Sequence, residues 1–483
     1  MRHGFIKCAA GTPEIKVGDC QGNADRAIDI ICVAAKEEVR FLVLPELCIT
    51  GYTCGDLFLQ QKLLDGALEG LKRIAKETEG CRMVVLVGLP ISNAGKLYNC
   101  AAVIYEGEVL GIVPKSHLPN YGEFYEARYF SPAPKENATI FIDKKQYPFG
   151  ANLLFVCKNM PQFTFGVEIC EDLWTAIPPS SNHCGEGASI IGNLSASNEV
   201  IGKEDYRRKL ISNQSARLIC GYVCACAGKG ESTTDLVFSG HNLVAENGVV
   251  LEESPLFSGK LSISEIDVFR LESERHRIRT ISSVDSRPDG YQKIIFDMTL
   301  DDTKLTRAFG RNPFVPDDAR ELGKRCETIL NIQALGLVKR LEHTGSKYAV
   351  IGVSGGLDSC LALLVCAKAM DMMNRPREDI MAVTMPGFGT TERTKINAER
   401  LACQIGATLK TVSIKDSVIQ HFKDIGHDPD DHSVVYENAQ ARERTQVLMD
   451  LANKYGGLMI GPGDLSELAL GFTTYNGDHM SMS

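Results

Sequence analysis

The 483-residue chain lacks long apolar runs and lacks any block of basic residues. Its longest apolar runs, such as residues 83–88 and 349–353, fall far short of the roughly 20 apolar residues that a membrane helix needs. The 52 basic and 61 acidic side chains give a formal net charge of −9, with no Lys/Arg-rich cluster. We therefore expect neither a membrane nor a nucleic acid among the partners of this protein.

The sequence also lacks a secretory leader, a disulfide framework and internal repeats. Its first residues lead directly into a strand-like pattern, without an apolar core or a small-residue cleavage site, so we expect a cytoplasmic protein. Cysteine is abundant, but its 17 occurrences are odd in number, and several lie inside apolar runs. Such thiols pack as small hydrophobic groups, and we expect no structural disulfides.

The length of the chain and its pattern of strand and helix signals predict two α/β domains. A chain of 483 residues with 44% hydrophobic and 23% charged residues predicts two or three globular domains. Residues 1–275 alternate short β-type runs with only a few helical patterns, and hairpin signals at 106–108 and 246–248 predict partly antiparallel sheets. Residues 276–325 carry scattered turn formers and are predicted to be a linker. Residues 326–483 alternate strands with helices, which is typical of a doubly wound parallel sheet.

The predicted elements are as follows. In the first domain we expect strands at 41–45, 83–89, 101–113, 164–169, 189–194, 222–227 and 236–245, and helices at 23–39, 63–77 and 203–218. Beyond it we expect helices at 319–343, 360–372 and 394–405, and strands at 348–353, 380–385, 408–412 and 458–460.

A small-residue loop in the second domain has the features of a phosphate-binding site. It joins a buried strand to a helix, so its backbone N–H groups and the helix N-terminus can converge on an anion. It lacks the Gly-Lys-Ser/Thr of kinase-type loops. The carboxylate of Asp358 would repel phosphate unless a cation intervened, which points to Mg²⁺. The candidate ATP-binding residues are Gly352, Val353, Ser354, Gly355, Gly356, Leu357, Asp358 and Ser359.

With its flanking strand and helix, this loop resembles those of the ATP pyrophosphatases, which cleave ATP between the α- and β-phosphates. The segments 384–390, 437–444 and 463–471 further resemble the signature segments of the NAD synthetases. The resemblance implies that deamido-NAD is held by Asn438 and Arg442, and that Glu467 helps to bind substrate or metal. It also implies that Phe472, Thr473, Thr474 and Tyr475 line the dinucleotide pocket. Pro462 stands near the nucleotide, where the family usually carries Thr, and this loss of a hydroxyl and an N–H could weaken ATP binding.

Three chemically useful side chains of the first domain each follow a predicted strand. They are Glu46, Lys115 and Cys170. A thiol is mostly protonated at pH 7, so a nucleophilic cysteine needs a base and a cation nearby. Considered one at a time, Glu46 is more simply explained as a surface carboxylate, Lys115 as a solvated lysine and Cys170 as a buried thiol. Active sites, however, are commonly assembled from side chains at the ends of several strands.

Together with the residues around them, these three resemble the Glu-Lys-Cys triad of the nitrilase superfamily, specifically the glutaminase domain of glutamine-dependent NAD synthetases. The resemblance implies that Glu46 takes the thiol proton, Cys170 attacks the side-chain amide of glutamine, and Lys115 stabilises the oxyanion. It implies that Tyr121, Ser197 and Lys203 contact the glutamine.

The resemblance to the glutamine-dependent NAD synthetases extends over nearly the whole chain. It implies an N-terminal nitrilase-like α-β-β-α sandwich and a C-terminal Rossmann-like domain, with glutamine, ATP and deamido-NAD as substrates and Mg²⁺ as the metal. It also implies ammonia transfer through a dry channel, a homo-oligomer and no tightly bound organic cofactor. Family members usually continue well beyond the position of Ser483, so we expect glutamine hydrolysis to exceed NAD formation in this chain.

Four alternatives stay open at this point. The chain could be a stand-alone amidase or glutaminase whose synthetase half is inactive through truncation. It could act on nitriles or N-carbamoyl amines, it could be a catalytically dead subunit, or it could be another ATP-dependent glutamine amidotransferase.

Overall fold

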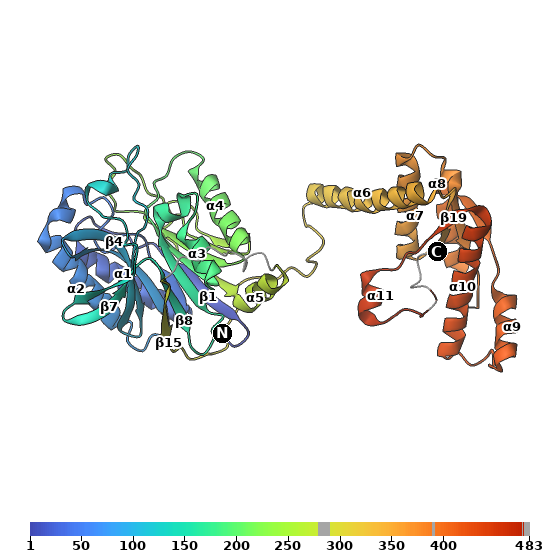
Figure 1. Cartoon of the computed structure of the whole chain (residues 1–483), viewed down its shortest axis with the longest axis horizontal. Coiled ribbons are helices and arrows are strands. Elements are labelled where there is room, and N and C mark those ends of the chain that lie inside the picture. Colours follow the sequence, from blue (N-terminus) through green and yellow to red (C-terminus); the bar gives the residue numbers. More distant parts are fainter. Residues whose placement is uncertain (279–289, 389–391, 476, 478–483) are drawn as a thin grey trace. The chain divides into compact units, whose positions relative to one another are not determined.

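The structure, a computed structural model, describes all residues except 279–289, 389–391, 476 and 478–483 (Figure 1). The chain divides into two compact units, Met1–Ala308 (unit 1) and Phe309–Ser483 (unit 2). Among the residues described, we find no helix with both the length and the apolar character needed to cross a membrane.

Unit 1 contains two mixed sheets. The first has the order β14 (Ser262–Asp267), β1 (Phe5–Ala10), β2 (Phe41–Val43), β3 (Val84–Asn93), β4 (Lys96–Tyr105), β5 (Glu108–Pro114), β7 (Lys145–Phe149) and β6 (Ala138–Ile142). The second has the order β13 (Val249–Glu253), β12 (Leu243–Glu246), β11 (Gly221–Cys226), β10 (Ile190–Ser195), β9 (Thr164–Ile169), β8 (Leu153–Cys157) and β15 (Gln292–Phe296). Both sheets combine parallel and antiparallel pairs, as the hairpin signals predict.

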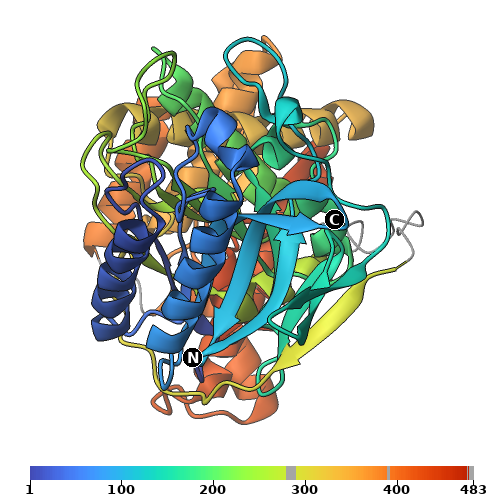
Figure 2. The same cartoon turned by 90° about the vertical axis from the view of Figure 1, so that its left-hand side faces the viewer.

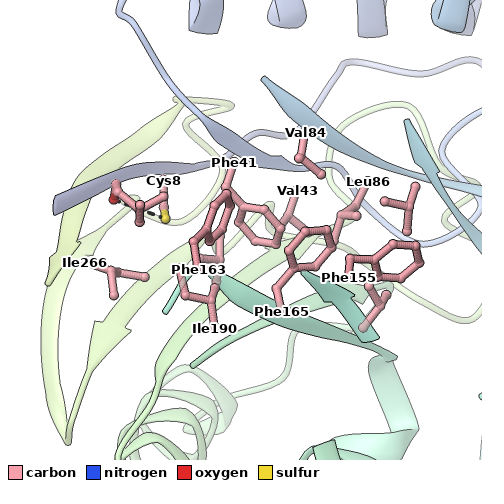
Figure 3. Packing of buried hydrophobic residues seen from close by; sticks show 14 of the residues in the cluster. Cys8, Phe41, Val43, Val84, Leu86, Phe155, Phe163, Phe165, Ile190 and Ile266 are labelled. Carbon is pink, nitrogen blue, oxygen red and sulfur yellow. Dashed lines mark hydrogen bonds between the residues drawn. The ribbon is translucent and has the colours of Figure 1, made fainter. Parts of the chain in front are cut away.

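The two sheets pack face to face. Figure 3 shows Phe41 and Leu86 of the first sheet meeting Phe155, Phe165 and Ile190 of the second in one buried cluster. Strands β2, β9 and β10 are buried at every position, and β3 is buried along its first eight residues, so the other faces of these strands are covered as well. Burial on both faces requires an outer layer of helices.

Helices supply these outer layers. The helices of unit 1 are α1 (Cys20–Lys36), α2 (Gln61–Glu77), α3 (Pro179–Gly185), α4 (Lys203–Leu218) and α5 (Val268–Arg277). The apolar faces of α1 and α2 lie side by side on the first sheet (Figure 2). Helices α3 and α4 contribute to the apolar cluster on the outer face of the second sheet. Unit 1 is therefore the predicted α-β-β-α sandwich.

Unit 2 is built on a four-stranded parallel sheet of order β18 (Thr408–Thr411), β17 (Ile380–Thr384), β16 (Tyr348–Gly352) and β19 (Gly457–Ile460). One face packs on α6 (Ala319–Thr344), α7 (Leu357–Met372) and α8 (Glu392–Ile405). The other packs on α9 (Lys415–Ile425) and α10 (Val434–Tyr455), and α11 (Leu465–Leu470) follows β19. This is the predicted doubly wound parallel sheet.

The segment expected to be a linker, 276–325, differs from the expectation in its described part. Residues Gln292–Phe296 form β15 and pair with β8 in parallel, which extends the second sheet of unit 1. Arg307 also donates hydrogen bonds to Glu246, so unit 1 continues to Ala308. Four of the five positions of strand β15 are exposed or half-exposed, and it is an edge strand. The strand is only five residues long, which is too short for a clear periodic signal in the sequence.

Candidate active sites

The first candidate site gathers side chains from the ends of three strands. Glu46 comes shortly after β2, Lys115 directly after β5 and Cys170 directly after β9. The first two strands belong to one sheet and β9 belongs to the other, so packing of the sheets brings the groups together. Gly88 on β3 is needed for this arrangement, because a Cβ there would lie 2.3 Å from the backbone nitrogen of Leu47.

Lys115 lies between two buried carboxylates. Its Nζ donates hydrogen bonds to Glu46 Oε1 and to Glu126 Oε1, each at 2.7 Å. The side chains of Lys115 and Glu46 are 0% exposed, so this ion-pair network is shielded from water. An ammonium has three donors, and the hydrogen bonds found among the described residues use two of them. The third is available to an oxyanion.

Further donors hold the two carboxylates in place. Asn99 Nδ2 donates to Glu46 Oε1 at 2.6 Å, and the backbone N–H of Ala196 donates to Glu46 Oε2 at 2.8 Å. The hydroxyl of Tyr52 donates to Glu126 Oε1 at 2.8 Å. With donors on both of its oxygens, Glu46 has a fixed orientation.

Burial and neighbouring opposite charges shift the pKa values of Lys115 and Glu126 in opposite directions. Burial lowers the pKa of Lys115, but the carboxylates of Glu126 and Glu46 outweigh it, and the pKa is raised well above its usual value. Burial raises the pKa of Glu126 to about 7, although the ammonium of Lys115 opposes this rise. Lys115 therefore stays charged at neutral pH.

Cys170 occupies a tight turn beside this cluster. It begins the short 3-10 helix η3 (Cys170–Trp174) with a φ of 43°, a left-handed conformation that costs a non-glycine residue about 1–2 kcal/mol. Burial raises the pKa of its thiol well above the usual range, the Glu46 carboxylate adds to the rise, and the Lys115 ammonium opposes it. The Ala196 N–H that binds Glu46 lowers this pKa as well. The thiol is thus protonated at rest and within the electrostatic reach of both partners.

Two of the three predicted glutamine contacts, Tyr121 and Lys203, interact electrostatically with Cys170. The hydroxyl of Tyr121 donates to Glu171, the residue after the cysteine, at 2.9 Å. The ammonium of Lys203 lies 5.5 Å from the centre of the Trp174 ring, donates to Asn198, and interacts with the charge of Cys170. Ser197 accepts a hydrogen bond from Arg207 at 3.2 Å.

A cavity of about 280 Å³ opens next to this cluster. Tyr52, Phe124 and Glu126 are among its lining residues, whereas its described lining does not include Cys170. The cavity therefore reaches the carboxylate side of the cluster.

A fully buried carboxylate lies close by on β9. Glu168 accepts hydrogen bonds from the Tyr222 hydroxyl and, at 2.8 Å, from the backbone N–H of Ser180. Burial raises its pKa from 4.5 to about 7, and these donors oppose the rise. Below pH 4.5 both the folded and the unfolded chain carry this proton. Between pH 4.5 and 7 only the folded chain keeps it, so this contribution to stability is lost as the pH rises.

We expect the Glu168→Gln variant to lose this pH dependence. The free energy of unfolding of the wild type, relative to that of the variant, should fall by about 3 kcal/mol between pH 4.5 and 7.5, because folding raises the pKa of Glu168 from 4.5 to about 7. Urea titrations across this pH range measure the difference. Glu69→Gln, at an exposed position on α2, is the control and should show a constant difference. A constant difference for Glu168→Gln would contradict the expectation.

The second candidate site lies in unit 2, where β16 leads into α7. Ser354 Oγ and Ser359 Oγ are 3.2 Å apart, and Ser354 Oγ also accepts from the backbone N–H of Gly356 at 3.2 Å. Gly355 has a φ of +81°, and a Cβ there would lie 2.5 Å from the carbonyl oxygen of Thr394. The loop thus has the tight geometry that the sequence predicts.

A cavity of about 690 Å³ opens over this loop. The predicted residues that line it are Gly352, Val353, Ser354, Gly356, Ser359 and Pro462. The other predicted loop residues, Gly355, Leu357 and Asp358, are not part of its described lining. Arg444, Gln440 and Thr384, which belong to the predicted segments 437–444 and 384–390, line it as well.

Some of the residues predicted to bind the dinucleotide contact one another. Asn438 Oδ1 accepts a hydrogen bond from Thr474 Oγ1 at 2.7 Å, and Arg442 Nε donates to the carbonyl of Tyr475 at 3.2 Å. Segments from α10 and from the chain after α11 therefore meet, although they are far apart in sequence. Phe472 and Tyr475 are largely exposed, while Thr473 is half-buried. Of the predicted segment 384–390, Gly389 and Thr390 lie outside the described residues.

The two carboxylates predicted to hold a metal have different surroundings. Asp358 is exposed in the first turn of α7. Glu467 instead caps α11, because its backbone N–H donates to Asp464 Oδ1 at 2.9 Å and its Oε2 accepts from the Asp464 N–H at 3.3 Å. Magnesium commonly uses only one or two carboxylates, completed by phosphate and water. Asp358 fits this donor set directly, whereas one carboxylate oxygen of Glu467 already accepts a hydrogen bond in the cap of α11.

The sequence missed the second carboxylate of the first site. Glu126 begins the 3-10 helix η2 (Glu126–Arg128), in an irregular segment that contains several charged residues. Nothing local separates it from Glu123 three residues earlier. Only its burial and its hydrogen bond to Lys115 reveal it.

Known proteins resemble this chain over nearly its whole length. The carbon-nitrogen hydrolase family matches residues 7–275, and the NAD synthase family matches residues 329–482. The chain is 41% identical over 495 residues to the glutamine-dependent NAD(+) synthetase of Mycobacterium tuberculosis, covering 99% of this chain and 73% of that protein. It is 32% identical over 473 residues to the enzyme of the same name from Thermotoga maritima, covering 96% and 75%.

A solved structure is similar as well. The crystal structure of a glutamine-dependent NAD(+) synthetase from Cytophaga hutchinsonii matches with a TM-score of 0.50 and 25% identity, covering 99% of this chain and 77% of that one.

Proposed function

The chain belongs to the family of glutamine-dependent NAD(+) synthetases, and on this premise we propose that unit 1 hydrolyses glutamine at Cys170 and that unit 2 uses the ammonia to amidate deamido-NAD. The family matches in both halves favour this function over a stand-alone amidase or glutaminase. The observation that carries the proposal is the buried cluster in which Lys115 Nζ lies 2.7 Å from Glu46, beside the thiol of Cys170.

The first reaction proceeds in two halves. Glu46 accepts the thiol proton while Cys170 Sγ attacks the side-chain carbonyl carbon of glutamine, and the third N–H of Lys115 stabilises the oxyanion. The tetrahedral intermediate collapses, the C–N bond breaks, and the proton returns from Glu46 to the leaving nitrogen, which departs as ammonia. Glu46 then takes a proton from water, whose oxygen attacks the thioester carbon. The C–S bond breaks, glutamate leaves, and the proton returns from Glu46 to the thiolate of Cys170.

The surrounding residues support this chemistry. Glu126 also binds the ammonium of Lys115, which therefore keeps a carboxylate partner while Glu46 gains and loses a proton. Tyr121, Ser197 and Lys203 are proposed to bind the polar ends of glutamine. A protonated carboxyl at Glu46 would still be held by Asn99 and Ala196.

The second reaction is proposed to use the cavity over the 354–359 loop. Ser354, Gly356 and Ser359 would hold the phosphates of ATP, and the N-terminus of α7 adds positive potential. Mg²⁺, which we propose Asp358 holds together with the phosphates, would offset their negative charge. The residues Asn438, Arg442 and 472–475 would bind deamido-NAD. Its carboxylate attacks the α-phosphate, pyrophosphate leaves, and ammonia then displaces AMP to form NAD.

We expect the Gly355→Ala variant to lose at least tenfold in NAD formation. The added Cβ would lie 2.5 Å from the Thr394 carbonyl oxygen at a φ of +81°, so the phosphate loop must move. Ammonia release by unit 1 should stay within threefold of the wild type. Gly336→Ala, with open space around its α6 position, serves as the control for both assays. Normal NAD formation by Gly355→Ala would show that the loop does not form part of the proposed ATP site.

A substrate panel tests the proposed function directly. The purified chain is assayed for ammonia release from glutamine, a nitrile and an N-carbamoyl amine, and for NAD formation from deamido-NAD, ATP and Mg²⁺ with glutamine or ammonium chloride. We expect glutamine to be preferred and both nitrogen sources to give NAD. A preference for the nitrile or the carbamoyl compound would refute the glutaminase assignment.

We further propose a cytoplasmic location and a homo-oligomer for this enzyme. All 17 cysteines are free thiols in the structure, in keeping with a reducing compartment. Size-exclusion chromatography with light scattering measures the oligomeric state.

A further inference from the structure

The carboxylate of Asp172 joins two segments that carry reacting groups of the first site. Its side chain is only 3% exposed. Oδ1 accepts hydrogen bonds from the backbone N–H groups of Ser116 at 3.1 Å and His117 at 2.8 Å, and from His117 Nδ1 at 3.0 Å. Ser116 and His117 directly follow Lys115, so Asp172 holds the chain that carries the ammonium.

The other oxygen of Asp172 holds the turn that carries the thiol. Oδ2 accepts a hydrogen bond from the backbone N–H of Ile169 at 3.0 Å, immediately before Cys170. Cys170 has a φ of 43°, a conformation that persists only where neighbouring contacts enforce it. The bond from Ile169 is one such contact, since it closes the turn across the cysteine.

These contacts connect the two sheets at the reactive end of the sandwich. Lys115 follows β5 of the first sheet, and Cys170 follows β9 of the second. A carboxylate that only capped η3 would need donors from its own turn alone. Asp172 instead accepts three hydrogen bonds from the segment after β5.

We propose that Asp172 is a positioning residue that sets the separation between Lys115 Nζ and Cys170 Sγ. This inference deepens the proposed function, because it assumes that these two groups act on the amide of glutamine. Asp172 itself does not touch the substrate. Its loss should therefore slow the chemical step and leave glutamine binding intact.

The test compares kcat and KM for ammonia release from glutamine in the full chain and in two variants. In Asp172→Asn, an NH₂ group replaces one acceptor oxygen and faces the N–H groups that the oxygen accepted from. In Asp172→Glu, the negative charge is kept, but one added methylene displaces it. For both we expect kcat to fall about 20- to 100-fold, with KM within threefold and unfolding still cooperative. Merely structural damage would instead reduce the fraction of active protein and broaden the unfolding transition.

Two controls match these variants. His117→Ala removes only one of the donors to Asp172 and should keep kcat within fivefold. Asp267→Asn alters a carboxylate that caps α5 away from the site and should leave kcat unchanged. Cys170→Ala separates the two proposals, because ammonia release by that variant would refute the proposed function itself.

Several results would overturn the positioning role while Cys170→Ala stays inactive. These are a kcat within threefold of the wild type in both Asp172 variants, or a rise in KM at unchanged kcat. Failure of both variants to fold, with folded controls, would assign Asp172 to folding and would also refute the proposal.

Discussion

Replacing Cys170 by Ala lowers the rate of ammonia release from glutamine by about 10⁴-fold or more, because no other group of the cluster can form the thioester. The Cys170 side chain lies in a buried turn, and removing one sulfur leaves the ion-pair network of Glu46, Lys115 and Glu126 in place. The variant should therefore fold. NAD formation from deamido-NAD and ATP should persist when ammonium chloride replaces glutamine, since the residues of unit 2 are unchanged.

Steady-state assays of ammonia and NAD measure the two activities of the Cys170→Ala variant separately. Cys32→Ala, which removes an exposed thiol from α1, is the matched control and should be indistinguishable from the wild type. Mass spectrometry of the wild type quenched during turnover should show the glutamyl adduct on Cys170. Ammonia release by Cys170→Ala at more than a tenth of the wild-type rate would contradict the assignment of the nucleophile.

The second large effect is expected for Lys115→Met, in both catalysis and stability. The variant lacks the oxyanion donor, which alone is worth about 10²–10³-fold in rate. It also leaves the carboxylates of Glu46 and Glu126 together in a site where the wild-type side chains are 0% and 5% exposed. Breaking a buried ion pair from one side typically costs about 3–5 kcal/mol. We expect ammonia release to fall about 10³-fold and the free energy of unfolding to fall by about this amount.

The stability loss of Lys115→Met should depend on pH. Without the ammonium, one or both carboxylates must stay protonated, and burial already raises the pKa of Glu126 to about 7 in the wild type. A raised folded-state pKa gives stability that is present at low pH and is lost as the pH rises, so the variant should lose least at pH 5 and most at pH 8.

Urea unfolding at pH 5 and pH 8 measures this change. Lys145→Met is the control, because Lys145 pairs with Glu108 at an exposed position and its loss should cost at most about 1 kcal/mol at either pH. An equal loss of stability for Lys115→Met at both pH values would show that the two carboxylates are not coupled through this lysine.

Local signals account for the parts of the fold that the sequence revealed. Strand β9 at Thr164–Ile169 and helix α4 at Lys203–Leu218 have the predicted bounds, because each carries its own pattern of apolar or helix-forming residues. The strands β6, β7 and β15 were not predicted, because each is only five residues long and lies at or next to a sheet edge, where little of the strand is buried. The phosphate loop was visible because strand, glycines and helix are contiguous.

The sequence by itself determined the two α/β domains, the strand-end positions of Glu46, Lys115 and Cys170, and the family, because each depends on residues that are neighbours along the chain. Only the tertiary structure decided that Glu126 shares the ammonium of Lys115 and that Asp172 joins the two sheets. The physical reason is that burial and hydrogen bonding between distant segments arise when the sheets pack. No local pattern distinguishes a carboxylate that will be buried there from one that will face water.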